Sequence, residues 1–393
     1  MTSTLVEQQI AALVALGVAE TEVRTIVSPY RICPLGAHVD HQGGSMLGMA
    51  ISACTVLAYA ASTDGRVRLT STDFAGAADF EIGAAAQRSG DWSDYARGAA
   101  AVLAPRIPSV PRGLVGVLRG TLPGGGLSSS ASVILACLEA LARINELSLR
   151  DEELVELTCA VENDHLGVRS GVLDPATIVG ARRNAMLHIE STKLQWRAIP
   201  LGAGAPPHRF LVLSSGIDRA LVATGFNDRV QECCDAAAAL ARAAGLPPAA
   251  RLGDVPAAAF DRHVASLPAV LQRRARHYFG ETARVAAGAE SWQRGDLRSF
   301  GRLMHESGRS SIENYECGTP PMIELLSILQ GTDGVLGARF SGAGFGGCCI
   351  ALVAGDAVDE ARAQIVRRFA QAHPELAQRV RAFAVDSVDG LHG

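Results

Sequence analysis

Three glycines followed by three serines form the segment of this chain whose chemistry is easiest to interpret. The segment begins at Thr121 and reads TLPGGGLSSSASVILACLEAL, passing from an expected strand end through Gly124–Gly126 and Ser128–Ser130 into an apolar helix. Glycines let a backbone approach an anion closely, and a helix start offers unpaired N–H groups and the positive end of the helix dipole. The pattern therefore indicates an anion site suited to phosphate. A glycine turn with an ordinary serine N-cap is the simpler alternative.

The near absence of lysine narrows the ways in which this chain could bind phosphate. Lys193 is its only lysine, and it lies in STKLQW with no glycine-rich loop before it. A Walker A loop needs a lysine after its glycines, and the protein-kinase fold needs one on its third strand. Both of these solutions are therefore excluded. A phosphate site here must depend on backbone N–H groups, hydroxyls, a metal ion and arginine.

A second glycine-rich segment lies near the C-terminus. Residues 342–347 read GAGFGG and match the G-x-G-x-x-G pattern of dinucleotide-binding folds. In those folds the pattern opens a helix, whereas the segment CCIALVA that follows here has the composition of a strand. The loop is therefore expected to join two strands. It is either a plain hairpin turn or a second glycine loop that packs beside the phosphates from the other half of the chain.

Secondary-structure patterns place the first glycine run between a strand and a helix. That helix is expected over Ser129–Ile144. Another is expected from about Ser148 to Asp164, with Ser148 and Asp151 as a capping box. Strand-like patterns occur near 23–29, 47–60, 67–73, 113–120 and 185–190.

Length and composition allow two or three domains with a large core. The chain has 393 residues, of which 48% are hydrophobic, and a domain commonly takes ~150 residues. Proline and glycine at 200–208 indicate a linker, so we place a domain boundary close to 205, dividing the chain into 1–205 and 206–393. Alanine-rich helical patterns fill about 226–310, and strand patterns flank the second glycine-rich segment.

Charge and cysteine usage exclude several other classes of protein. The formal net charge is −4 and like charges are not clustered, so nucleic acid is not an expected partner. The N-terminus lacks the basic region of a signal peptide, and no apolar run is long enough to span a bilayer, so a membrane is not expected either. The nine cysteines include no C-x-x-C pair, which is typical of a reduced, cytoplasmic protein.

Three segments, in order, resemble the three motifs of the GHMP kinases, and specifically of the galactokinase branch. They are RICPLGAHVDHQGG at 31–44, LPGGGLSSSAS at 122–132 and FSGAGFGGC at 340–348. VENDHLGVRSGVLD at 161–174 and RLMHESGRSSIENYECGTP at 302–320 resemble two further galactokinase stretches. The resemblance covers most of the chain. It implies an α+β fold with a ribosomal S5 domain 2-like N-terminal lobe, a ferredoxin-like C-terminal lobe and an active site between them.

The resemblance also implies an ATP-dependent sugar kinase that acts on the anomeric hydroxyl. Asp174 matches the aspartate that orients and deprotonates this hydroxyl, and Arg31 matches the arginine between sugar O1 and the transferred phosphoryl group. Phosphoryl transfer depends mainly on positioning and charge stabilisation, so one carboxylate, one arginine and one Mg²⁺ suffice. Glu162 and Ser130 match the positions that hold Mg²⁺, although Glu162 could also be a plain surface residue of a helix.

The remaining matched positions imply contacts with sugar and nucleotide. His38, Asp40 and Gly171 match residues that contact the sugar. Trp92 resembles a residue beside the adenine, and could equally be a core aromatic. The expected ATP-binding residues are Pro123, Gly124, Gly125, Gly126, Leu127, Ser128, Ser129, Ser130, Trp92, Gly342 and Gly344.

Several positions in the expected sugar site depart from the galactokinase pattern. Ala37 stands where galactokinases have a glutamate that accepts a hydrogen bond from the sugar 6-hydroxyl, and Arg169 stands where they have a proline. His41 replaces a tyrosine, and Phe226 lies near the position of a sugar-contacting tyrosine. One carboxylate has thus left the pocket and one guanidinium has entered it. This exchange suits a sugar with a carboxylate at C6, which an arginine can bind with two hydrogen bonds.

These departures predict D-galacturonic acid as the sugar and galacturonate 1-phosphate as the product. The stretch SPYRICPLGAHVDHQGG, with Arg169 and IENYECG, also resembles plant galacturonokinases. Neutral drift at Ala37 and Arg169 is the alternative, and it would leave galactose or another galactose-like sugar as the substrate. A non-catalytic sugar and ATP sensor is the alternative from another class. The expected enzyme is cytoplasmic and is a monomer or a small homo-oligomer.

Overall fold

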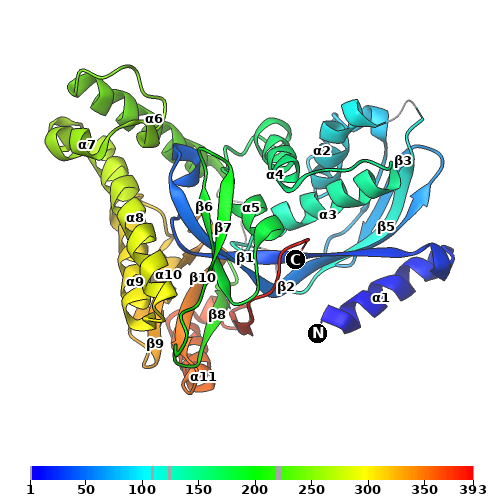
Figure 1. Cartoon of the computed structure of the whole chain (residues 1–393). Helices are drawn as coiled ribbons and strands as arrows, with labels where there is room; N and C mark the ends of the chain where they lie inside the picture. Colours follow the sequence, from blue (N-terminus) through cyan, green and yellow to red (C-terminus); the bar gives the residue numbers. More distant parts are fainter. Residues whose placement is uncertain (1, 108–109, 123–124, 218–222, 393) are drawn as a thin grey trace.

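The structure of the chain, a computed structural model, describes residues 2–107, 110–122, 125–217 and 223–392. Two β-sheets lie at its centre and helices cover them (Figure 1). The α+β class predicted from the sequence is confirmed. Pro123 and Gly124, two of the predicted ATP contacts, lie outside the described residues.

The first sheet is built from the N-terminal half of the chain and has seven strands within the described residues. Its order is β4-β3-β5-β2-β6-β7, with β1 paired to β2 outside this path. The pair β3–β5 is parallel and the other pairs are antiparallel. The strands are β1 (Arg24–Leu35), β2 (Ser45–Ser62), β3 (Arg66–Ser71), β4 (Ala77–Glu81), β5 (Gly113–Gly120), β6 (Ala185–Glu190) and β7 (Gln195–Pro200).

Helices cover both faces of this sheet because its central strand β2 is buried on both sides. Alternate residues of a strand point to opposite faces. Leu57 belongs to the main core, together with residues of the helices on one face, whereas Ala58 packs against Leu13 on the other face. Figure 1 shows α1 on the side of the sheet opposite to α3. The helices concerned are α1 (Thr2–Ala15), α2 (Asp94–Leu103), α3 (Ser129–Ile144), α4 (Asp151–Ala160) and α5 (Leu173–Gly180).

The second sheet is antiparallel and has the order β11-β8-β10-β9. Its strands are β8 (His208–Ser214), β9 (Val335–Ser341), β10 (Cys348–Ala354) and β11 (Arg381–Val385). Leu211 and Ala351 share a buried cluster with α10 (Pro320–Gln330) and α11 (Val358–Ala372). Val212 and Ile350 face the other way and share a cluster with β1, β2, α8 (Ala269–Gln293) and α9 (Leu297–Glu313). The second sheet therefore packs against the first through its α8–α9 side.

Several predicted elements need correction. The helix expected to start near Ser148 begins at Asp151, and its N-cap is Arg150, whose N–H donates to Glu153. A five-residue π-helical turn, Val161–His165, then continues α4. The long helical region is divided into α6 (Ala223–Ala243), α7 (Ala257–His263), α8 and α9. Strands β4, β7 and β11 were not predicted, because they are short and partly exposed.

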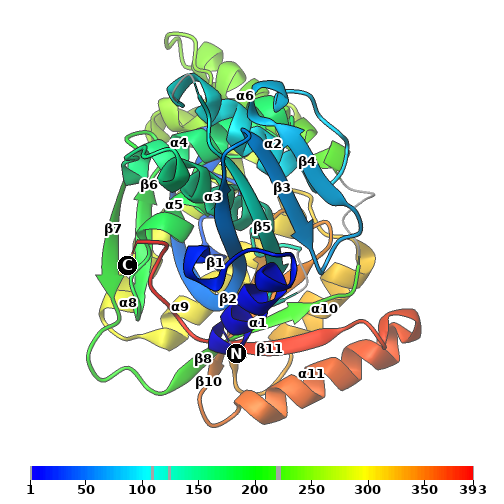
Figure 2. The ribbon, with the colours of Figure 1, turned by 90° about the vertical axis from the view of Figure 1, so that its right-hand side faces the viewer.

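The C-terminal segment returns to the first half of the chain. After β11, the backbone N–H of Val388 donates to Ala50 in β2 and that of Gly390 donates to Ala181 after α5, at 3.1 and 2.8 Å. Figure 2 shows this segment running up beside α5. Contacts of this kind cross the boundary at 205, which stays a prediction. Among the described residues, no helix is both long and apolar enough to pass through a membrane.

Candidate active site

Arg31 and Asp174 form a buried ion pair where three elements meet. Arg31 lies on β1 and is 3% exposed, and Asp174 lies in the first turn of α5. The guanidinium Nε donates to Asp174 Oδ1 at 2.6 Å, and Nη1 donates to the carbonyl of Gly126 at 2.9 Å. Ser128 is the N-cap residue of α3, and its hydroxyl donates to the other carboxylate oxygen of Asp174. The pair predicted to be catalytic is thus joined directly to the first glycine loop (residues 123–128).

The second glycine loop (residues 342–347) packs against the first through backbone atoms. It joins β9 to β10, as predicted, and so it is not a dinucleotide fingerprint. A Cβ added to Gly126 would lie 2.5 Å from the carbonyl oxygen of Ser341, and one added to Gly342 would lie 2.8 Å from the Cα of Gly126. Both glycines have positive φ, and the Ser341 hydroxyl donates to the Gly126 carbonyl at 2.6 Å. Glycine is therefore required on both sides of the contact.

The turn between β1 and β2 brings the first motif to the same place. His38 adopts a left-handed conformation with φ of 62° and is buried. Asp40 follows it and accepts a hydrogen bond from the backbone of Leu173, next to Asp174, at 3.4 Å. A Cβ on Gly171 would lie 2.4 Å from Asp40 Oδ2. The structure therefore brings together Asp40, Gly171 and Asp174, which are far apart in the sequence.

Aromatic rings surround the side chain of His38. The ring of Tyr315 stacks on it, with centroids 4.1 Å apart and planes 9° apart. His41 lies edge-on to Phe226 at 5.9 Å and bonds the Tyr315 hydroxyl through Nε2 at 3.2 Å. Burial, then His277, then Arg169, lower the pKa of His41 to about 3, so this ring is neutral. His38, His41 and Phe226, three of the residues at or beside the predicted sugar site, thus lie in one cluster of rings with Tyr315.

Two carboxyl groups near Asp174 have raised pKa values. Burial, followed by the charge of Asp174, raises the pKa of Glu162 to about 7 and that of Asp40 to about 6. Glu162 is 6% exposed, so the surface alternative for this residue is wrong. Its Oε2 accepts a hydrogen bond from the Ser170 hydroxyl at 2.5 Å. Carboxylate oxygens are the ligands that a hard cation such as Mg²⁺ prefers, but in the described part of the chain no three or more His, Cys, Asp or Glu side chains are grouped as a metal site.

The other predicted site residues differ in burial and in the residues that they contact. Ala37 is buried beside His38, whereas Arg169 is exposed and its Nη1 donates to Gln231 at 3.1 Å. Trp92 is half-buried beside Phe74 and its Nε1 donates to the carbonyl of Ala75 at 3.1 Å, so its contact with adenine stays a prediction. Gly125 and Leu127 lie in the first glycine loop, Ser129 and Ser130 begin α3, and Gly344 lies in the second glycine loop. The contacts of these residues with ATP stay a prediction.

Several residues that contact the site were not among the predicted site residues, although they lie in segments that resemble the galactokinase branch. Tyr315, Cys317 and Ser170 contact predicted site residues directly. Tyr315 and Cys317 lie on either side of Glu316, which has a positive φ of 56°, so the turn that carries them has an unusual backbone. The resemblance of IENYECG to other proteins does not indicate that Tyr315 and Cys317 contact His38, because the two segments lie far apart in the sequence.

Comparison with known proteins agrees with this geometry. The GHMP kinases N terminal domain matches residues 94–181 and the GHMP kinases C terminal domain matches residues 288–373. The chain is 39% identical to a galacturonokinase of Arabidopsis thaliana, covering 91% of this chain and 90% of that one. It is 32% identical to a galactokinase of Roseiflexus sp. (strain RS-1), covering 93% and 91%.

A solved galactokinase structure has the same fold as this chain. Lactococcus lactis galactokinase complexed with galactose superposes with a TM-score of 0.89 at 28% identity, covering 99% of this chain and 98% of that one. The fold and the site thus define a small-molecule kinase built around two glycine loops. The chain belongs to the GHMP kinase family.

Proposed function

We propose that this chain is an ATP-dependent sugar 1-kinase that converts D-galacturonic acid to galacturonate 1-phosphate. The observation that carries the proposal is the Arg31–Asp174 pair, which is bonded to the first glycine loop on one side and faces the β1–β2 turn on the other. This arrangement supports a base and a cation acting between the part of the site suited to phosphate and the part suited to a polyol. The relatives named galacturonokinase and galactokinase support the same reaction class.

The proposed step is a direct transfer of the γ-phosphoryl group. Asp174 accepts the proton of the anomeric hydroxyl while O1 forms a bond to the γ-phosphorus, and the bond from that phosphorus to the bridging oxygen of ADP breaks. Each oxygen of Asp174 is engaged, one by Arg31 and one by Ser128, which fixes the carboxylate plane. Each oxygen keeps a further lone pair for the substrate hydroxyl. Arg31 stabilises the charge that spreads over the transferred group.

The nucleotide is proposed to lie over the first glycine loop, with its phosphates at the start of α3. Backbone N–H groups and the helix dipole replace the lysine that this chain lacks there. Glu162 and Ser130 are the residues proposed to hold Mg²⁺, which would neutralise charge on the phosphates. Burial is the main cause of the raised pKa of Glu162, followed by the charge of Asp174, and a bound cation would oppose both by stabilising the ionised carboxylate.

The absence of an acidic side chain at residue 37 favours a sugar acid over galactose. Two carboxylates about 4 Å apart repel by about 4 kcal/mol at an effective dielectric near 20, which is about a thousandfold in affinity. Ala37 imposes no such cost on a C6 carboxylate. Arg169 is proposed to bind this carboxylate. Its backbone N–H donates to Asn227 and its side chain to Gln231, so it is anchored to α6, which also carries Phe226.

Coupled measurement of ADP release on galacturonate, galactose and glucuronate tests the proposal. We expect galacturonate to have the highest kcat/KM, and Arg169→Gln to raise its KM while leaving that of galactose unchanged. A clear preference of the wild-type chain for galactose would contradict the choice of sugar. Galactose is accordingly the second candidate, and the galactokinases among the relatives favour it.

A cytoplasmic enzyme that is a monomer or a small homo-oligomer completes the proposal. All nine cysteines lie in the described part of the chain and are free thiols, as a reducing compartment would keep them. A non-catalytic sensor would be expected to lack one of the reacting groups, whereas Arg31 and Asp174 are present and paired. Release of ADP that depends on the sugar would exclude the sensor.

A further inference from the structure

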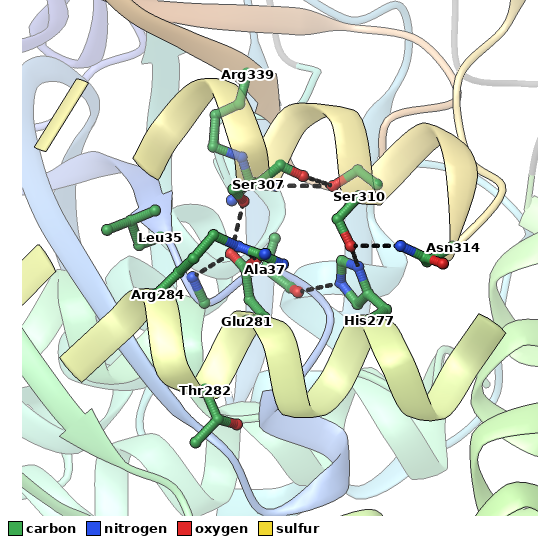
Figure 3. Close-up of polar contacts among 12 residues, drawn as sticks. Leu35, Ala37, His277, Glu281, Thr282, Arg284, Ser307, Ser310, Asn314 and Arg339 are labelled. Atoms are coloured by element: carbon green, nitrogen blue, oxygen red, sulfur yellow. Dashed lines mark hydrogen bonds and ion pairs between the residues drawn. The ribbon is translucent and has the colours of Figure 1, made fainter. Parts of the chain in front are cut away.

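A buried polar cluster on α8 and α9 lies directly behind the β1–β2 turn. Figure 3 shows Ala37 between the two helices, with His277 and Glu281 on α8 on one side and Ser307 and Ser310 on α9 on the other. Ser307 bonds Glu281, and Ser310 bonds His277. His277, Glu281 and Ser307 are at most 1% exposed. None of these side chains belongs to the three glycine-rich motifs, and the proposed reaction does not use them.

His277 bonds the carbonyl of Ala37, and this bond defines the tautomer of the histidine ring. Its Nε2 lies 3.0 Å from the Ala37 oxygen and its Nδ1 lies 3.0 Å from the Ser310 hydroxyl. A carbonyl oxygen only accepts, so Nε2 carries the hydrogen and Nδ1 accepts from Ser310. Asn314 then donates to the Ser310 oxygen at 3.2 Å. Burial lowers the pKa of His277, so the ring is neutral and suits this chain of three hydrogen bonds.

Glu281 holds the preceding residue of the same turn. Its Oε1 accepts from the backbone N–H of Gly36 at 2.8 Å and from the Ser307 hydroxyl at 2.6 Å. Its Oε2 accepts from Arg284 at 2.7 Å. Two consecutive residues of the turn are thus fixed, one through its N–H and the next through its carbonyl, by side chains one helical turn apart on α8.

The turn needs such support because its backbone is unfavourable on its own. Gly36 has φ of 91° and His38 has φ of 62°, so Ala37 lies between two left-handed residues. A residue with a Cβ adopts this conformation only where its surroundings hold it. His38 then stacks on Tyr315, and Asp40 reaches the start of α5. The direction of both side chains therefore depends on the conformation at residues 36–38.

The same cluster reaches the second glycine loop. Arg339 is fully buried on β9, two residues before Ser341. Its Nη1 donates to the carbonyl of Cys33 on β1 at 3.2 Å, and its Nη2 contacts Ser311 of α9 at 3.5 Å. Arg339 therefore joins the strand that carries Arg31 and the strand that leads into the second glycine loop to each other and to α9.

We propose that His277 is a positioning residue for sugar binding, which acts by holding the Ala37 carbonyl so that His38 and Asp40 face the sugar. Glu281 supports the same turn through Gly36, and Ser310 and Asn314 set the orientation of His277. The inference rests on the proposed function, since it assigns the β1–β2 turn to the sugar.

Two variants of similar size separate this role from a general contribution to folding. In His277→Gln the longer side chain brings an amide donor to the position of Nε2, and the bond to Ala37 is kept. In His277→Asn the amide reaches only the position of Nδ1, so the contact with Ser310 is kept and the bond to Ala37 is lost. We expect His277→Asn to raise the Kd for galacturonate about tenfold, and His277→Gln to change it less than about twofold.

Calorimetric titration with galacturonate, and separately with a non-hydrolysable ATP analogue, gives the two affinities without turnover. The analogue should bind both variants as it binds the wild type. His305→Leu serves as the control, because His305 of α9 also bonds a backbone group, the N–H of Ala338 at 3.2 Å, but away from the turn. We expect this control to lower the melting temperature without changing sugar affinity.

The outcomes distinguish this inference from the function on which it rests. Equal weakening of sugar binding by the asparagine and glutamine variants, or an equal loss of affinity for the ATP analogue, would refute the positioning role while the wild-type chain still binds galacturonate. Binding of galactose and not galacturonate by the wild type would refute the choice of sugar, and the same variants titrated with galactose would still decide the role of His277. A wild-type chain that binds neither sugar would refute both.

Discussion

Replacing Glu281 by glutamine tests the electrostatics of the cluster behind the β1–β2 turn. Burial alone would raise the pKa of this carboxyl group, but Arg284 and Arg339 outweigh burial and lower it from 4.5 to about 2. A difference of about 2.5 units, at about 1.4 kcal/mol per unit, corresponds to about 3 kcal/mol of stability that the ionised form contributes at neutral pH. Glutamine keeps the shape but removes the counter-charge of Arg284 and of the fully buried Arg339.

The sign of the effect follows from the lowered pKa. The contribution of Glu281 is fully present above the unfolded pKa near 4.5 and is lost as the pH falls towards about 2. Urea unfolding followed by circular dichroism should therefore show Glu281→Gln to be about 3 kcal/mol less stable than the wild type at pH 7, with a smaller difference at pH 3.5. The matched control is Glu290→Gln, an exposed glutamate on the same helix, which should change stability by less than about 0.5 kcal/mol. A Glu281→Gln variant as stable as the wild type at pH 7, or a deficit that stays constant in acid, would refute the reasoning.

Three further predictions concern the reaction and its sugar. Asp174→Asn should lower kcat on the order of a thousandfold with little change in the Kd for an ATP analogue, and unchanged turnover in the coupled assay would contradict its role as the base. Ala37→Glu should weaken galacturonate binding up to about a thousandfold while galactose binding is kept or improved. Competition titration with the two sugars measures this difference. Equal effects on both sugars would argue against a sugar carboxylate near residue 37. Because burial and Asp174 raise the pKa of Asp40 to about 6, kcat/KM for the sugar should fall as the pH drops through about 6, and an acidic limb near pH 4 instead would show that Asp40 does not need to be ionised.

Local sequence patterns were sufficient to predict those helices and strands whose ends are marked by a few neighbouring residues. The helix Ser129–Ile144 was predicted with both ends correct, because a glycine–serine run precedes it and its apolar residues repeat at helical spacing. The helix α4 was misplaced at its start, since Ser148 and Asp151 fit a capping box but Arg150 and Glu153 form the actual cap. Residue preferences alone cannot decide which of two neighbouring positions caps a helix, because tertiary packing also determines where the helix begins.

Some residues of the site could be predicted from short sequence motifs, whereas others come together only through contacts that are distant in the sequence. Arg31, Asp174 and Ser128 each lie in a motif that is compact in the sequence, and the structure brings the three together. His277 lies 240 positions from Ala37, in an alanine-rich helix whose pattern resembles any amphipathic helix. Its contact with the turn depends on how α8 packs on the first sheet, which no local pattern encodes. A resemblance of motifs thus pointed to the groups proposed to react, but not to the side chains that hold them.

The direct contact between the two glycine loops has a consequence for how such an enzyme can diversify. Gly126 and Gly342 meet through main-chain atoms, so a mutation at either position cannot be repaired by moving a neighbouring side chain. Ala37, Arg169 and Phe226 instead depart from the galactokinase pattern in their side chains, and Arg169 is exposed. New acceptors are therefore expected to arise through substitution of such side chains, while the two glycine loops proposed to hold the phosphoryl donor stay unchanged. The same asymmetry recommends positions 37, 169 and 226 for libraries that seek altered sugar preference.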